Sequence, residues 1–116
     1  MRVNKTFTVG ADEINVATGL TTAAQPTDRL MAKRVFVQML SGGSGIGYVL
    51  GGVSYGIVGD ATNDSHVTAE LAPAAAGSPG GSYSDSDDHA DIELSKMWVH
   101  GANAGDKIKV SYDLPV

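Results

Sequence analysis

The stretch from Asp91 to Tyr112 constrains the fold most, because its apolar residues follow the period of a β-strand. Over residues 107–112 apolar and polar side chains alternate, which is the pattern of a half-buried strand. In the preceding arm Met97 and Val99 share one face, and the only tryptophan, Trp98, takes the other. Between the arms lie glycines and an asparagine, which favour turn positions with positive φ. The sequence therefore predicts a β-hairpin with a loop of several residues.

Short alternating segments also precede this stretch. They are residues 5–9, 13–18, 33–40, 46–50, 51–60 and 66–71. A glycine-rich turn joins 33–40 to 46–50, which predicts a second hairpin. Thr27 or Asp28 is a candidate cap for one helical turn over residues 28–31. With no long helical pattern, the predicted fold is all-β, an antiparallel β-sandwich or jelly-roll-like barrel with long loops and little helix.

The chain of 116 residues has the size of one domain. Residues 1–19 are expected to form an N-terminal arm or strand. Residues 72–90, rich in Gly, Ser, Pro and Asp, are expected to form one long loop. The apolar fraction is 42%, but aromatic residues make up only 6% and glycines number 15, so most of the side chains available for a core are small. This composition favours stabilisation by neighbouring copies.

Charge and residue usage exclude several kinds of function. The net charge of −5 argues against nucleic acid and anionic membranes as partners. The absence of cysteine excludes disulfides, thiolate metal sites and a cysteine nucleophile. The chain holds no apolar run of the kind found in signal peptides or membrane spans, which predicts a protein made in the cytoplasm and no membrane partner.

One motif carries a catalytic pattern. Residues 52–56 read G-V-S-Y-G and match the G-x-S-x-G signature of hydrolases. That signature needs a strand, a sharp turn and a helix in a large sheet, whereas glycines and strand-forming residues follow here. No nucleotide-binding glycine pattern is present. The sequence thus predicts that the chain is not an enzyme and binds no cofactor.

Two groups of side chains are candidates for metal binding. The acidic run over residues 84–91 offers oxygen ligands suited to calcium, but it lacks the glycine and terminal glutamate of an EF-hand. Its carboxylates are Asp85, Asp87, Asp88 and Asp91. The histidines at 66, 89 and 100 show no helical pairing, although a zinc site assembled in space stays open. A solvated loop and ordinary histidines are the favoured interpretations, so no metal is predicted.

Some apolar residues lie on otherwise polar faces. Phe36 and Leu40 fall on the polar side of segment 33–40, which suggests a covered surface. Together with Tyr55 and Trp98 they are the expected subunit-contact residues. Trp98 and the tyrosines are alternatively a platform for stacking sugars.

Taken in order, several segments resemble small β-sandwich virion proteins of tailed bacteriophages. The segments are TTAAQ (21–25), KRVFVQ (33–38), GYVLGG (47–52), ELAP (70–73) and DIELSKMWVHGANAGDKIKVSY (91–112). The last is the most specific. Ala follows Pro73 where the family pattern has Gly, residues 74–89 look like an insertion, and residues before Gly19 are not covered.

The resemblance implies a structural virion protein, specifically a capsid decoration or cement protein that stabilises the head shell at capsid subunit junctions. Its implied partner is the major capsid protein, its implied location the capsid surface, and its implied state a homotrimer. Relatives of this kind also sit in head fibres or tails, so a carbohydrate- or host-binding module there is the alternative.

Overall fold

A computed structural model of the chain describes residues 1–20, 29–51 and 67–115. Strands dominate these residues, together with one short 3-10 turn, η1 (Leu94–Lys96). The strands are β1 (Arg2–Thr8), β2 (Ile14–Asn15), β3 (Met31–Ala32), β4 (Arg34–Met39), β5 (Gly47–Leu50), β6 (Val67–Leu71), β7 (Ser82–Ser86), β8 (Ile92–Glu93), β9 (Trp98–Gly101) and β10 (Lys107–Asp113). Within the described residues no helix is long and apolar enough to cross a membrane.

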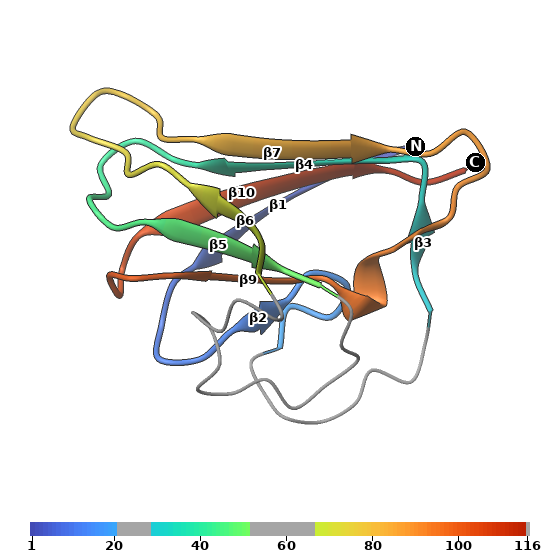
Figure 1. The fold of residues 1–116 in the computed structure, drawn as a ribbon, viewed down its shortest axis with the longest axis horizontal. Coiled ribbons are helices and arrows are strands. Elements are labelled where there is room, and N and C mark those ends of the chain that lie inside the picture. Colours follow the sequence, from blue (N-terminus) through green and yellow to red (C-terminus); the bar gives the residue numbers. More distant parts are fainter. Residues whose placement is uncertain (21–28, 52–66, 116) are drawn as a thin grey trace.

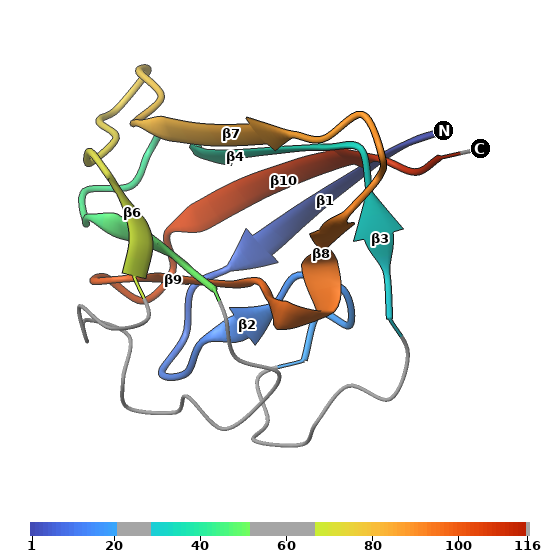
Figure 2. The same cartoon turned by 45° about the vertical axis from the view of Figure 1, so that its right-hand side comes forward.

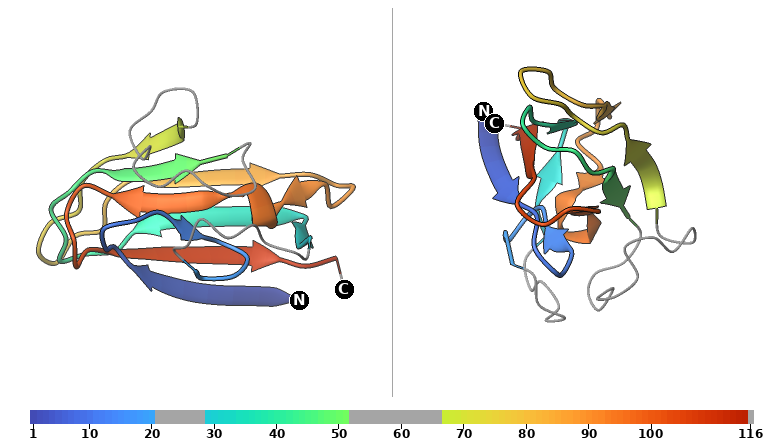
Figure 3. Two further views of the ribbon diagram at one scale, coloured as in Figure 1. Left: turned by 90° about the horizontal axis from the view of Figure 1, so that it is seen from below. Right: turned by 90° about the vertical axis from the view of Figure 1, so that its left-hand side faces the viewer.

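Two four-stranded antiparallel sheets form the body of the molecule (Figure 1). The first has the order β1-β10-β4-β7 and the second β2-β9-β5-β6, while β3 and β8 pair at one end. Seen from the end, the two larger sheets lie on opposite sides of the molecule (Figure 3). The predicted all-β, antiparallel fold is confirmed, and its assignment as a sandwich or jelly roll stays a prediction.

The main core lies between the two sheets. Alternate residues of β1, β4 and β10 face it from one side, among them Phe7, Val37 and Val110, while Val49 and Val99 face it from the other. A second, smaller cluster joins Tyr48, Leu50 and Trp98, with Val67 packed against it. Since Val99 belongs to the first cluster and Trp98 to the second, the predicted alternation along this arm is confirmed.

The predicted hairpin over Asp91 to Tyr112 is wrong. Both arms are strands, but β9 pairs with β2 and β5 in the second sheet, whereas β10 pairs with β1 and β4 in the first. The connecting loop therefore carries the chain from one sheet to the other, as Figure 2 shows. Val99 and Val110 both need the same core, and placing the arms on opposite sides of it buries both.

The predicted second hairpin fails for the same reason. Strand β4 pairs with β10 and β7, whereas β5 pairs with β6 and β9 in the other sheet. The helical turn expected over residues 28–31 does not extend to Met31, because Met31 begins strand β3 and pairs with Glu93.

One segment expected to be irregular belongs to the first sheet. Residues 82–86, inside the predicted long loop 72–90, form β7 and pair with β4 along its length. Residues 1–19, expected to be an arm or a strand, contain the strand β1, which pairs with β10 over seven residues. Backbone pairing to a long neighbour orders Ser82–Ser86 although only Tyr83 packs against the core.

A buried carboxylate ties together the two loops where the chain crosses between sheets. Asp106 is 9% exposed, and its Oδ2 accepts hydrogen bonds from the amides of Gly45 (2.9 Å) and Ser44 (3.3 Å). A Cβ at Gly43 would come within 2.8 Å of the carboxyl carbon of Asp106, so any other residue there would have to displace this hydrogen-bonded carboxylate. The Asp106 carbonyl also accepts from Val9 N (2.8 Å), which fixes the end of β1 at the same place.

Candidate functional site

The outer face of the β1-β10-β4-β7 sheet carries the candidate site. Register places polar side chains of all four strands in rows across it. The first row is Arg2, Asp113, Arg34 and Ser86; the second is Asn4, Ser111, Phe36 and Ser84; the third is Thr6, Lys109, Gln38 and Ser82. Because these residues alternate with the core residues, their side chains point away from the molecule.

A shallow groove of about 780 Å³ runs over the first two rows and reaches Lys109. Phe36 lies in the second row and lines this groove, and the residue is 39% exposed. Beside it the Ser111 hydroxyl donates to Asn4 Oδ1 at 2.6 Å. The groove therefore combines one apolar ring with a polar, hydrogen-bonding floor.

An ion-pair network closes one end of the groove. Arg2 donates twice to Asp113, from Nε to Oδ1 at 2.7 Å and from Nη2 to Oδ2 at 3.0 Å, and Arg34 Nη1 lies 3.7 Å from Oδ2. The hydrogen bond from Arg2, with the charges of Arg2 and Arg34, lowers the pKa of the Asp113 carboxyl, and the same bond raises the pKa of Arg2. Asp113 therefore stays ionised, and because one carboxylate faces two guanidinium groups, this end of the groove keeps a net positive charge.

The outer face is basic although the chain is acidic. Arg2, Arg34, Lys107 and Lys109 lie on it, which is half of the eight basic residues of the chain. Asp113 is the acidic residue within the rows, and Asp85 lies at the rim of the groove. An acidic surface would therefore be attracted to this face and repelled by much of the rest of the molecule.

The four residues expected at subunit contacts have different environments. Phe36 is exposed on the outer face, and Leu40 is half-buried just beyond β4. Trp98 is only 2% exposed and packs against Tyr48 and Leu50, so it presents no free ring for a partner or a sugar. Tyr55 lies outside the described residues.

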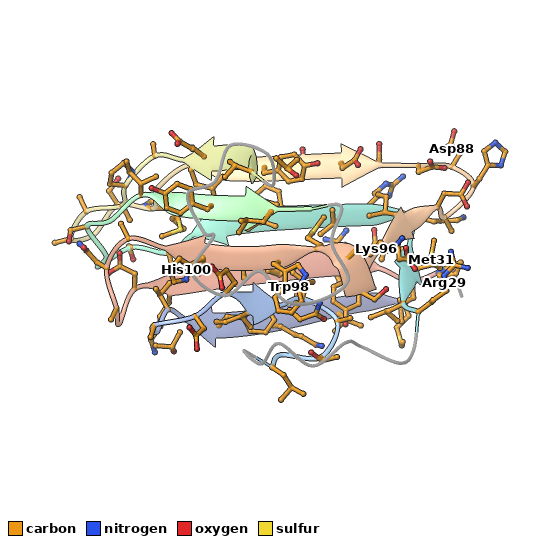
Figure 4. The ribbon with its side chains drawn as sticks, turned by 60° about the horizontal axis from the view of Figure 1, so that its bottom comes forward. Arg29, Met31, Asp88, Lys96, Trp98 and His100 are labelled. Atoms are coloured by element: carbon orange, nitrogen blue, oxygen red, sulfur yellow. The ribbon has the colours of Figure 1, made fainter. Side chains whose placement is uncertain are left out.

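The predicted metal candidates do not converge. Within residues 1–20, 29–51 and 67–115, no group of three or more His, Cys, Asp or Glu side chains could hold an ion. In the acidic run, two carboxylates accept hydrogen bonds from nearby backbone amides at 2.8 Å: Asp85 from Ser86 and Asp87 from His89. The other two, Asp88 and Asp91, are exposed. Figure 4 shows Asp88 at one end of the molecule and His100 towards the other. His66 and the G-x-S-x-G segment at 52–56 lie outside the described residues.

Sequence patterns identified only part of this face. Phe36 was recognisable as an apolar residue on the polar side of a strand. Arg2 and Asn4 had no such signal, because β1 reaches the Phe36 strand only through β10, which lies about a hundred residues away from β1 in the sequence. The alternation of Lys107, Lys109 and Ser111 did indicate an outer face, but not which strands would flank it.

Comparison with protein-family models, with curated proteins and with solved structures found no match for this chain.

Proposed function

We propose that this chain is a non-enzymatic structural protein of a virion, a capsid decoration or cement protein that attaches to the shell through the outer face of its β1-β10-β4-β7 sheet. The choice of this face as the attachment surface rests on one observation: the Phe36 ring is exposed there among Arg34, Lys109 and the Asn4–Ser111 pair. The virion context comes from the resemblance of residues 21–112 to phage virion proteins. The proposed partner is an acidic region of the major capsid protein.

The composition of the face suits adhesion. Full burial of a phenylalanine side chain contributes about 1.5–3 kcal/mol, so covering the exposed part of Phe36 adds up to about 1 kcal/mol. The surrounding cations steer an acidic partner and fix its orientation more than they add affinity. Phe36 supplies the central apolar contact, and Arg34 and Lys109 supply orientation at its rim.

The size of the face favours an oligomer. Strand β4 has six residues, which at about 3.3 Å each gives about 20 Å, and four strands about 4.8 Å apart give a similar width. The resulting area of about 400 Å² is smaller than the roughly 800 Å² per partner of a typical stable interface. One chain would bind weakly, whereas a homotrimer engaging a repeating shell would bind through several faces at once. We therefore include the homotrimer in the proposal.

The alternative function, a carbohydrate- or host-binding module of a head fibre or tail, has less support. Its proposed stacking platform used Trp98 and the tyrosines. Trp98 and Tyr48 are both buried in the smaller cluster.

The test is co-sedimentation of the purified protein with shells that lack it, together with its mass in solution. We expect saturable binding in a regular ratio to the major capsid protein, weakened by added salt, and an oligomeric mass. A protein that is monomeric at high concentration and stays in the supernatant would rule out the cement function. Binding to glycans but not to shells would favour the alternative.

A further inference from the structure

A row of ionisable residues crosses the outer face of the other sheet, β2-β9-β5-β6. His100 of β9 pairs with Tyr48 of β5, which pairs with Glu70 of β6. Strand β2 pairs Ile14 with Val99, so the same register continued by one residue places Glu13 opposite His100. Ile14 and Val99 face the main core, which puts Glu13 and His100 on the opposite face. Figure 4 shows His100 and Trp98 along β9.

Both members of the Glu13–His100 pair have a buried polar atom without a partner. Glu13 is only 1% exposed, and neither its Oε2 nor His100 Nδ1 has a hydrogen-bond partner. The two atoms therefore do not bond each other. Burying a carboxylate oxygen and an imidazole nitrogen without partners is costly, so an unsatisfied pair at neighbouring positions calls for a specific cause.

One ion would satisfy both atoms. A carboxylate oxygen and a neutral imidazole nitrogen each offer a lone pair, and side chains directly opposite on antiparallel strands have Cβ atoms about 4.5–5.5 Å apart, within reach of a shared ion. Imidazole favours zinc, copper and nickel, whereas calcium and magnesium prefer oxygen ligands alone.

We propose that Glu13 Oε2 and His100 Nδ1 bind a divalent transition-metal ion, with Zn²⁺ as the best match. The described residues supply only these two protein ligands, whereas a structural zinc site usually has four. Water completes the coordination, and the Tyr48 ring flanks the ion on the next strand. The ion joins β2 to β9, a pairing that spans only two residue pairs, and so holds the edge of the sheet. This site is independent of the proposed attachment face.

The test is titration of the metal-free protein with Zn²⁺, followed by calorimetry and by thermal unfolding. We expect one Zn²⁺ per chain and a higher unfolding temperature, with no such effect of Ca²⁺ or Mg²⁺. Glu13→Gln and His100→Phe should each weaken Zn²⁺ binding at least about tenfold. Glu70→Gln on the same row and His89→Phe in the exposed loop are the matched controls, and both should bind Zn²⁺ as the wild type does.

Thermal unfolding of the metal-free variants distinguishes a loss of metal ligands from a loss of folding. Glu13→Gln replaces a buried carboxylate by a neutral amide, which costs less to bury, so the metal-free variant should unfold at or above the wild-type temperature. His100→Phe keeps a ring of similar shape and gives a second folded variant. The proposal is overturned if wild-type protein binds no Zn²⁺, if folded Glu13→Gln and His100→Phe bind it unchanged, or if His89→Phe abolishes binding.

Discussion

Replacing Trp98 by alanine is expected to lower the free energy of unfolding by about 3–5 kcal/mol, as truncation of a large buried aromatic side chain does. Trp98 is 2% exposed, and its ring packs on Tyr48 and Leu50 in the smaller cluster, so alanine leaves a cavity there. Small domains have a total stability of about 5–15 kcal/mol, so this one change removes a large part of it. Chemical denaturation of wild type and variant measures the difference.

Phe36→Ala is the matched control for Trp98→Ala. Phe36 is also aromatic and on a strand, but it is 39% exposed, so its truncation leaves no enclosed cavity and should cost far less stability. Similar losses for the two variants would mean that Trp98 is not part of the packed interior.

Reversing two charges on the outer face, in the double variant Arg34→Glu/Lys109→Glu, is expected to weaken shell binding at least about tenfold. Arg34 and Lys109 lie along the groove on either side of the Phe36 row, so glutamates there would repel an acidic partner. Both side chains point outward, and the ion pair of Arg34 with Asp113 is long at 3.7 Å, so the loss of stability should stay within about 1 kcal/mol, from the like charges then opposed at positions 34 and 113. Co-sedimentation and denaturation measure the two effects.

Arg29→Glu/Lys96→Glu is the matched control, with the same change of net charge elsewhere. Arg29 and Lys96 both contact Glu93, and hydrogen bonds from these two cations lower the pKa of that carboxyl. Figure 4 shows the two residues close together near η1. If this variant is folded by chemical denaturation and still loses shell binding as strongly as the first, binding depends on net charge and not on the outer face.

Local structure was largely predictable from the sequence, because strands with one buried face alternate polar and apolar residues. Strand β4 follows this rule, with Val35, Val37 and Met39 buried. Strand β7 was missed because Ser82–Ser86 carries no such alternation, and its order comes from backbone pairing with β4.

Strand partners were not predictable in the same way. Residues 97–99 and 107–112 have alternating patterns that fit one sheet as well as two sheets sharing a core. The choice depends on contacts distant in sequence, such as β1 pairing with β10. The candidate sites depend on the same long-range pairing, so neither the groove around Phe36 nor the Glu13–His100 pair could be assembled from local patterns.

Hydroxyl-radical labelling of Phe36 shows whether the outer face of the β1-β10-β4-β7 sheet contacts the shell. Ile46 is an internal reference, because it is 37% exposed, close to the 39% of Phe36, but lies in the loop before β5. We expect shell binding to protect Phe36 from labelling and to leave the labelling of Ile46 unchanged. Labelling of Phe36 that stays the same in the bound protein would contradict it.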